Sequence, residues 1–272
     1  MNHGFPLENC RALITGASSG LGAEFARQLA PQAAELILVA RRGDVLEEVK
    51  TSLAGQKAHV TCFAADLGSD TGRTSLIAYL DQNGLKPNLL INNAGLGDYG
   101  PFASSPTDKT RLQIDLNITA LTMLTHALLP KMEGRGGVLN VSSLASTLPM
   151  PELAVYAASK SYVTSFSEAL AIELAPRGIT VTCVCPGPTP TNFSQTAKRN
   201  DGTDTNRDGQ ALLRILPSQV VSEALTALQS GQSCVFPGMG VKVAGSLFRL
   251  MPRFLMRWIL RRRLGNQQKG GH

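Results

Sequence analysis

Short runs of apolar and β-branched residues alternate along this chain with longer segments of helical periodicity. The apolar runs predict seven strands, at Arg11–Thr15, Leu36–Ala40, Ala58–Ala64, Leu89–Asn92, Gly137–Ser142, Thr180–Cys185 and Cys234–Phe236. The longer segments predict helices near Gly20–Ala30, Gly43–Leu53, Thr71–Asn83, Thr107–Met132, Leu153–Ala175 and Ser218–Gln229. Strands separated by helices indicate βαβ units and therefore a parallel sheet. We expect a doubly wound α/β fold, with helices on both faces of the sheet and ligands at the carboxyl ends of the strands.

The pattern contains neither an internal repeat nor a domain linker, so we expect a single domain over residues 1–240. A basic extension, residues 241–272, follows it. One polar segment, Thr196–Gln210, is rich in Asp, Asn, Gly and Thr and predicts a loop. Because this segment follows the sixth predicted strand, it either covers the ligand site or is simply an exposed connection.

Composition excludes several classes of protein. With 43% hydrophobic and 17% charged residues among 272, the chain is typical of an ordinary globular protein. Its five cysteines and four histidines lack the spacing of a disulfide framework or a zinc site, so we expect no metal and a reducing, cytoplasmic location. We also find no secretory signal and no apolar run long enough to span a membrane.

The net charge of +6 is concentrated at the C-terminus. The chain beyond residue 248 has no acidic residue and the following basic ones: Arg249, Arg253, Arg257, Arg261, Arg262, Arg263 and Lys269. The rest of the chain is therefore close to neutral, which argues against a nucleic-acid partner.

Four of these arginines recur every fourth residue from Arg249 to Arg261, which predicts a basic stripe on a helix. Phe254, Trp258 and their neighbours make much of the rest of that helix apolar, and Pro252 either kinks it or starts a new helix. Two interpretations stay open. The extension docks on the catalytic domain or a partner subunit, or it makes peripheral contact with an anionic membrane surface.

A glycine-rich turn follows the first predicted strand directly. The segment Thr15–Gly22 has the spacing G-x-x-x-G-x-G and leads into an amphipathic helix. Glycines permit tight turning and close approach of the backbone, while the start of a helix offers free N–H groups and a positive dipole end to a pyrophosphate. Strand, turn and helix together predict a dinucleotide-binding site.

The choice of dinucleotide depends on the end of the second strand, where an acidic residue would bind a ribose hydroxyl. This chain has Ala40-Arg41-Arg42 there. A guanidinium favours the additional 2′-phosphate of NADP, and no carboxylate repels that phosphate. We therefore expect Arg41 to select NADP(H) over NAD(H). The alternative, a solvated arginine at a helix start, fits Arg42 better than Arg41.

Tyr156 and Lys160 lie four residues apart in a predicted helix, so the phenol and the ammonium share one face. A nearby cation favours the phenolate and lowers a tyrosine pKa that is about 10 when unperturbed. The pair therefore predicts a general acid or base poised for neutral pH. Taken alone, such a pair is equally typical of a solvated helix face.

Seven motifs in order resemble the short-chain dehydrogenase/reductase family, over roughly Cys10 to Phe236. They are Thr15–Gly22, Asp66-Leu67, Asn92-Asn93-Ala94-Gly95, Asn117, Ser142-Ser143, Tyr156-x-x-x-Lys160, and Pro186-Gly187 followed by Thr189 and Thr191. The resemblance implies a Rossmann fold and an NAD(P)-dependent catalytic domain. Nothing in these motifs departs from the family pattern in a way that suggests lost activity.

The resemblance implies a catalytic role for four residues. Tyr156 would donate the proton for carbonyl reduction or accept it for alcohol oxidation, and Lys160 would lower its pKa and bind the nicotinamide ribose. Ser143 would hold the substrate oxygen. Its neighbour Ser142 is rejected, because the family pattern places this serine thirteen residues before the tyrosine. Asn117 would hold a water that links Lys160 to solvent.

Further positions are implied to bind the cofactor. Besides Tyr156 and Lys160 they are Gly16, Ser18, Ser19, Gly20, Leu21, Gly22, Arg41, Asp66, Leu67, Asn93, Ala94, Gly95, Pro186, Gly187, Thr189 and Thr191. Structural alternatives exist for some of these polar residues. Asn92 and Asn93 would also suit bracing of the sheet through side-chain-to-backbone bonds, and Asp66 a cap or turn.

The sequence thus predicts an oxidoreductase that transfers hydride between NADP(H) and a small carbonyl or alcohol substrate. The apolar C-terminal region hints at a lipophilic ketone. We expect a homodimer or homotetramer. The alternative is a non-catalytic protein that senses NADP(H) and engages partners through its basic tail; a complete set of Ser143, Tyr156 and Lys160 argues against it.

Overall fold

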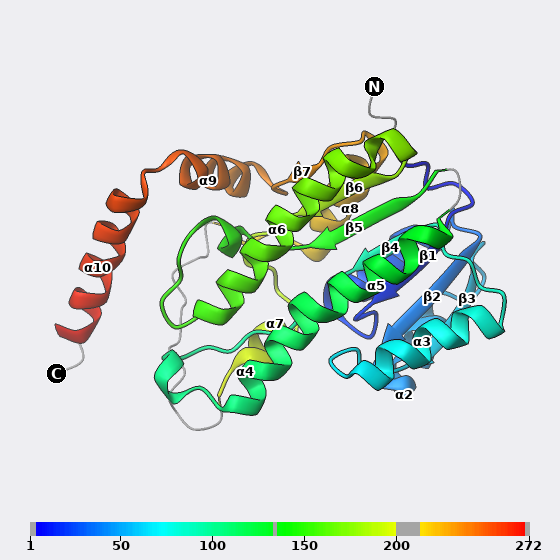
Figure 1. Ribbon diagram of the computed structural model, residues 1–272, viewed down its shortest axis with the longest axis horizontal. Coiled ribbons are helices and arrows are strands. Elements are labelled where there is room, and N and C mark those ends of the chain that lie inside the picture. The colour runs from blue at the N-terminus through cyan, green and yellow to red at the C-terminus, as the bar shows by residue number, and fades with distance from the viewer. Residues whose placement is uncertain (1–3, 133–134, 200–212, 270–272) are drawn as a thin grey trace.

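The computed structural model describes residues 4–132, 135–199 and 213–269. Seven parallel strands form one sheet in the order β3-β2-β1-β4-β5-β6-β7 (Figure 1). The strands are β1 Arg11–Thr15, β2 Glu35–Ala40, β3 His59–Ala64, β4 Leu89–Asn92, β5 Gly137–Val141, β6 Thr180–Val184 and β7 Cys234–Val235. The strand order reverses between β1 and β4, which is the doubly wound topology that the sequence predicts, and ligands bind at such a reversal.

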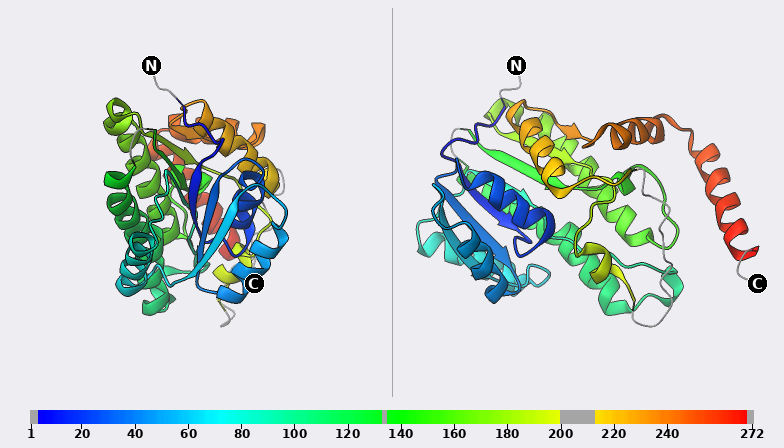
Figure 2. Two further views of the ribbon diagram at one scale, coloured as in Figure 1. Left: turned by 90° about the vertical axis from the view of Figure 1, so that its right-hand side faces the viewer. Right: turned by 180° about the vertical axis from the view of Figure 1, so that it is seen from behind.

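Helices cover both faces of the sheet, as two views of the ribbon show (Figure 2). The main helices are α1 Gly20–Leu29, α2 Gly43–Ser52, α3 Asp70–Gln82, α4 Thr107–Ile114, α5 Leu121–Leu128, α6 Ala154–Leu174 and α8 Pro217–Gln229. Helices α1, α2 and α8 pack in one apolar cluster, while α3, α5 and α6 pack in a second one. In β1, Ile14 belongs to the first cluster and Leu13 to the second, so the strand is buried on both faces.

The predicted helix Thr107–Met132 is interrupted, which corrects the sequence analysis. A π-helical turn, Asp115–Ala120, separates α4 from α5, and a short 3₁₀ turn, Leu129–Lys131, follows α5. The buried positions Gln113, Asn117, Ala120 and Leu124 keep helical spacing through this turn, so the sequence pattern does not reveal it. This turn buries Asn117, which is only 1% exposed.

Two helices follow the last strand. Helix α9, Met239–Leu250, packs on the domain through Val241 and Gly245, which are buried beside Phe236. Helix α10, Arg253–Lys269, begins just after Pro252 and extends away from the body of the molecule (Figures 1 and 2). Docking of the extension is thus observed for α9, whereas α10 buries Met256 and brings Leu260 to the cleft but leaves Phe254 and Trp258 exposed. The domain boundary at residue 240 stays a prediction.

Most of the polar segment Thr196–Gln210 lies outside the described residues. Its beginning is structured: α7, Phe193–Ala197, runs into Arg199, which is buried. In the described part of the chain, no helix combines the length and the apolarity that crossing a bilayer requires.

Candidate active site

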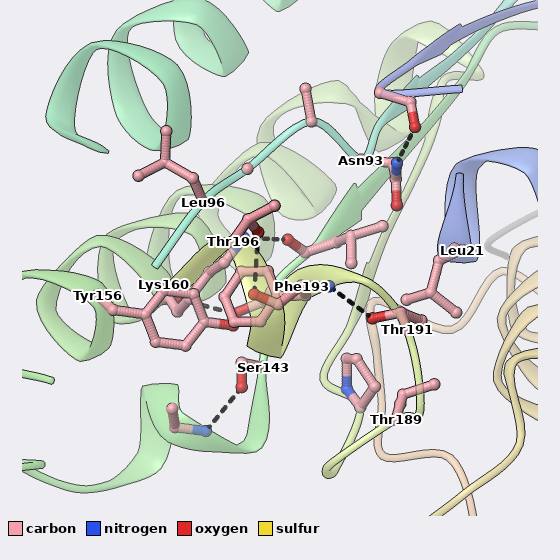
Figure 3. A pocket seen from close by; sticks show the side chains of 18 of the residues that line it. Leu21, Asn93, Leu96, Ser143, Tyr156, Lys160, Thr189, Thr191, Phe193 and Thr196 are labelled. Carbon is pink, nitrogen blue, oxygen red and sulfur yellow. Dashed lines mark hydrogen bonds between the residues drawn. The ribbon is translucent and has the colours of Figure 1, made fainter. Parts of the chain in front are cut away.

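A cleft of about 980 Å³ opens at the carboxyl ends of the strands, at the point where the strand order reverses. All the predicted site residues line it except Gly22 and Asn117. The strands therefore bring together motifs that are far apart in the sequence. Figure 3 shows how Ser143, Tyr156, Lys160 and Phe193 approach one another in this cleft.

The glycine turn is packed too tightly to accept side chains. Gly16 and Gly20 have φ values of +66° and +56°, in the left-handed region that favours glycine. A Cβ atom on Gly22 would lie 2.2 Å from the carbonyl oxygen of Gly16, so the glycine here lets α1 approach the strand. The side chain of Ser19, which precedes α1, makes no capping hydrogen bond. The first-turn amides of α1 thus face the cleft with the positive end of the helix dipole.

Asn93, the first residue after the neighbouring strand β4, braces this turn. Its side-chain amide donates to the carbonyl oxygens of Thr15 (2.9 Å) and Gly16 (3.2 Å). The Thr15 hydroxyl in turn accepts from the backbone amides of Asn93 and Ala94, both at 3.0 Å. The bracing role considered for Asn93 is therefore observed, and it places the Asn93–Gly95 backbone along the floor of the cleft.

Asp66 and the arginines after β2 line the nucleotide end of the cleft. Asp66 accepts a hydrogen bond from the amide of Gly68 (3.1 Å), which is the turn-forming role considered above. Arg41 and Arg42 are both exposed. Leu67, in contrast, is buried and packs in the second apolar cluster.

Tyr156 and Lys160 share one face of α6, as expected, and the Lys160 Nζ atom lies 5.7 Å from the centre of the tyrosine ring. The ammonium donates to the carbonyl oxygen of Val141 at 2.9 Å. Burial lowers the pKa of Lys160 to about 8, and burial raises the pKa of Tyr156 to about 12, with a smaller opposing effect of the hydrogen bond to Ser143.

The expectation that Lys160 brings the pKa of Tyr156 toward neutrality is therefore wrong for this structure. Desolvation disfavours the phenolate more than the hydrogen bond to Ser143 favours it. The phenol is protonated at neutral pH, which suits a proton donor.

Ser143 and Ser142 lie at the end of β5 but point to different partners. The Ser143 hydroxyl accepts from the amide of Ala145 (3.1 Å) and lies beside the tyrosine in the cleft (Figure 3). The Ser142 hydroxyl is buried and bonds the carbonyl oxygen of Lys160 (2.9 Å) and the hydroxyl of Thr164 (2.7 Å). The rejection of Ser142 agrees with this geometry.

Asn117 is tied into the protein by its side chain. Its amide oxygen accepts from the Leu96 N–H (2.9 Å), and its nitrogen donates to the Leu96 carbonyl (2.9 Å) and the Ser159 hydroxyl (3.0 Å). Ser159 donates to the carbonyl oxygen of Tyr156 (2.7 Å). Asn117 thus links the floor of the cleft to the first turn of α6, and its role in a water relay stays a prediction.

A family model described as short chain dehydrogenase matches residues 11–202. The chain belongs to the short-chain dehydrogenase/reductase family. One relative, dehydrogenase/reductase SDR family member 4 of Sus scrofa, is 35% identical over 196 residues, which are 70% of this chain and 69% of the relative. The predicted family and Rossmann fold are confirmed.

Solved structures of the family are also similar to this chain, and one of them extends the similarity into the C-terminal helices. A short-chain dehydrogenase from Sphingobium yanoikuyae in complex with NADPH is 27% identical, with a TM-score of 0.76 over 97% of this chain and 96% of that chain. A 3-ketoacyl-(acyl-carrier-protein) reductase from Brucella melitensis complexed with NADH is 28% identical, with a TM-score of 0.72 over 85% and 97%. The family assignment supports an oxidoreductase with a nicotinamide cofactor.

Sequence reasoning missed the apolar and aromatic residues that line the cleft outside the motifs. They are Leu96, Tyr99, Leu148, Met150, Leu153, Phe193, Leu213, Phe248 and Leu260. Most lie in loops, where apolar residues follow no period. Phe193 could have been predicted from the sequence, because it lies two positions after Thr191, the last residue of the motifs. In the described residues, no group of three or more His, Cys, Asp or Glu side chains is placed to hold a metal ion.

Proposed function

We propose that this protein is an NADP(H)-dependent carbonyl reductase, reversible as an alcohol dehydrogenase. The observation that carries the proposal is the meeting of Ser143, Tyr156 and Lys160 in one cleft with the glycine turn. A protein that only binds a dinucleotide needs the turn but has no need of a half-buried phenol and hydroxyl with a buried ammonium beside it.

The residues present fit a nicotinamide dinucleotide. The backbone of Gly16–Gly20 forms a cradle in which Cβ atoms would clash, and the uncapped first turn of α1 opens onto it. Asp66 and Leu67 would lie against the adenine, while Pro186, Gly187, Thr189 and Thr191 would border the nicotinamide and the phosphates. When bound, such a cofactor supplies or accepts a hydride at the substrate carbon.

The chain's own residues would manage the proton and the developing charge. Ser143 holds the carbonyl oxygen, and the protonated Tyr156 gives its proton to that oxygen as the carbon is reduced. Lys160 lies close enough to stabilise the phenolate that this transfer leaves behind. In the oxidation direction the same phenolate accepts the proton from the alcohol.

Arg41 supports the preference for NADP(H). Arg41 and Arg42 line the cleft beyond β2, and Ala40 stands where a carboxylate would bind a ribose hydroxyl. An exposed guanidinium there is available for a 2′-phosphate. The relatives with NADPH and with NADH leave the choice open, so it rests on these residues.

We assign the apolar residues outside the motifs to the substrate end of the cleft, and this end supports a lipophilic ketone. Its walls are leucines, Met150 and aromatic rings, and helices α9 and α10 add Phe248 and Leu260. An apolar wall of this kind favours an acyl chain or another bulky hydrocarbon group over a small polar carbonyl compound. The relative named as a 3-ketoacyl reductase is consistent with that class.

The experiment follows deuterium from NADPH that is deuterated at both C4 positions into the product for a panel of ketones that differ in chain length. We expect transfer to the carbonyl carbon, with the highest kcat/KM for long or bulky ketones. The alternative function is a non-catalytic NADP(H) sensor. Tight binding of NADPH without turnover of any carbonyl or alcohol would favour that sensor.

Two proposals concern partners. Exposed apolar residues on α4–α6 (Ile114, Met123, Tyr162 and Ile172) support a homodimer or homotetramer, which light scattering after gel filtration measures.

The second proposal is that α10 contacts an anionic membrane surface, which its exposed arginines and aromatic rings would suit. Flotation with anionic vesicles at low and high salt tests this contact, and absence of salt-sensitive flotation excludes it.

A further inference from the structure

The segment Pro186–Arg199, called the strap below, runs along the cleft and is anchored at both ends. Near its start, Thr191 lies against the glycine turn, where a Cβ atom on Gly20 would be 3.2 Å from the threonine side chain. At its other end, Arg199 is buried against the loop between β4 and α4. Phe193 lies between these two anchors, over the tyrosine (Figure 3).

Arg199 forms a buried, two-point ion pair with Asp98. Its Nε and Nη2 atoms donate to the two carboxylate oxygens at 2.9 and 2.5 Å, and the two side chains are only 3% and 5% exposed. Its Nη1 atom also reaches the carbonyl oxygen of Pro101 (3.2 Å) and the hydroxyl of Ser104 (3.1 Å). The guanidinium thus binds the end of the strap to the loop between β4 and α4.

A second cation supports the same carboxylate. Lys109 of α4 lies 3.1 Å from Asp98 and also donates to the carbonyl oxygens of Ala197 and Lys198, at 3.3 and 3.1 Å. Burial alone would raise the pKa of Asp98, but hydrogen bonds from Arg199, Ser105 and Lys109 lower it to about 2. The carboxylate is therefore charged throughout the physiological pH range.

The ion pair brings the loop and the strap together beside the reacting groups. The amide of Tyr99 donates to the carbonyl oxygen of Ala197 (2.9 Å). Gly97 leaves room for Phe193, because a Cβ atom there would lie 2.8 Å from the tip of the ring. The ring centres of Phe193 and Tyr156 are 5.2 Å apart at an angle of 48°. A tilted contact of this kind fixes both rings.

We propose that the Asp98–Arg199 ion pair is a positioning latch that holds Phe193 against Tyr156 and so sets how a substrate carbonyl meets the phenol. The latch rests on the proposed function. A buried ion pair contributes little to stability, because its attraction mainly offsets the desolvation of two charges. Its effect here is geometric: it fixes Phe193 over the reacting atoms, and the fixed ring excludes water and limits the width of the substrate that fits.

The test uses Arg199→Met, Phe193→Ala and the double variant. Arg199→Met is preferred to a change at Asp98, because Asp98 keeps Lys109 and Ser105 as partners and is not left as a lone buried charge. Arg199→Lys is the conservative variant. Lys131→Met is the control, because it breaks an ion pair with Asp81 that is distant in the fold and more exposed.

We expect Arg199→Met to lower kcat/KM for a bulky ketone by about 10- to 100-fold, which is the usual cost of a misplaced reacting group. The Kd for NADPH changes less than about twofold, Arg199→Lys recovers part of the loss, and the control is unchanged. In the Phe193→Ala background the change Arg199→Met has no further effect, because it acts through that ring.

Hydrogen exchange gives a readout that does not depend on turnover. The Tyr99 amide should exchange faster in Arg199→Met, while amides of β1 and β4 keep their protection. The latch is overturned if the losses in kcat/KM of the two single variants multiply in the double variant, or if the exchange rate of the Tyr99 amide is unchanged in Arg199→Met.

If wild-type protein reduces no ketone, the proposed function fails instead, and the exchange result still shows whether the ion pair holds the strap. Should Arg199→Met not fold, Gly97→Ala displaces the same ring with Arg199 intact, and an unchanged kcat/KM there overturns the latch as well.

Discussion

The ammonium of Lys160 lies 5.7 Å from the centre of the Tyr156 ring and is held there by the carbonyl oxygen of Val141. Strand β5 thus positions the cation, while α6 carries both side chains. Lys160 is buried and Tyr156 is half-buried in the cleft, so desolvation makes each resist its charged form: the pKa of Lys160 is lowered to about 8 and that of Tyr156 is raised to about 12. The site keeps an ammonium beside a neutral phenol, which is the pair that a proton donor needs.

Replacing Lys160 by Met should stabilise the fold at neutral pH while it impairs activity. Between pH 8 and 10.5 the unfolded chain binds a proton at this lysine that the folded chain has lost, so this group makes wild-type stability rise with pH over that window. Below pH 8 the buried charge destabilises the folded state by about 3 kcal/mol, because the pKa is lowered from 10.5 to about 8. Loss of the hydrogen bond to Val141 offsets about 1 kcal/mol of this, so Lys160→Met should raise the free energy of unfolding by about 2 kcal/mol at pH 7.

Urea unfolding of both proteins at pH 7 and at pH 10 measures this difference. We expect the advantage of Lys160→Met to shrink at pH 10. Wild-type protein that is more stable than the variant at pH 7, with the same margin at pH 10, would contradict the burial account. The raised pKa of Tyr156 acts in the opposite sense only above pH 10, where stability falls until about pH 12.

Arg41→Ala should weaken NADPH binding about tenfold and change NADH binding less than about twofold, because a charge-assisted bond to the 2′-phosphate is lost. Arg42→Ala is the matched control from the next position, and we expect a smaller loss. Fluorescence titration of both variants with both cofactors measures the four constants. An equal loss for NADPH and NADH would show that Arg41 does not read the phosphate.

Gly22→Ala should disrupt the turn, because its Cβ atom would lie 2.2 Å from the Gly16 carbonyl oxygen and 2.6 Å from the Asn93 amide nitrogen. Overpacking of this kind costs about 1–3 kcal/mol, and the displaced turn should raise the Kd for NADPH more than tenfold. Gly43→Ala, where the nearest atom is a side-chain carbon at 3.3 Å, is the control. Thermal melts and cofactor titrations together check both effects. A Gly22→Ala protein with normal stability and affinity would rule out the close packing.

The sequence predicted the sheet and the motif residues because both leave local patterns. Apolar runs flanked by turns give the strands, and the motifs in loops follow the carboxyl ends of β1, β3, β4, β5 and β6 at one edge of the sheet. Asn117, Tyr156 and Lys160 instead lie in helical segments. The interruption of the long helix around Asn117 left no such pattern, because Gln113, Asn117, Ala120 and Leu124 are buried at spacings of three and four residues, as in an uninterrupted helix.

The remaining part of the site depends on contacts between segments distant in the chain. Asp98 and Arg199 are 101 residues apart and meet only after the sheet has formed. The pKa of Tyr156 likewise depends on how deeply the finished fold buries the phenol, and the spacing to Lys160 carries no information on depth. Loop residues such as Phe193 acquire their role from the same assembly.

The most direct test of the account compares wild-type protein with Tyr156→Phe. The variant keeps the ring and its contact with Phe193 but removes the hydroxyl that we assign as the proton donor. With NADPH and a bulky ketone, we predict a fall in kcat of about 10²- to 10⁴-fold, while the Kd for NADPH stays within about twofold. A Tyr156→Phe protein that retains more than about a tenth of the wild-type kcat would contradict the assignment of Tyr156 as the proton donor.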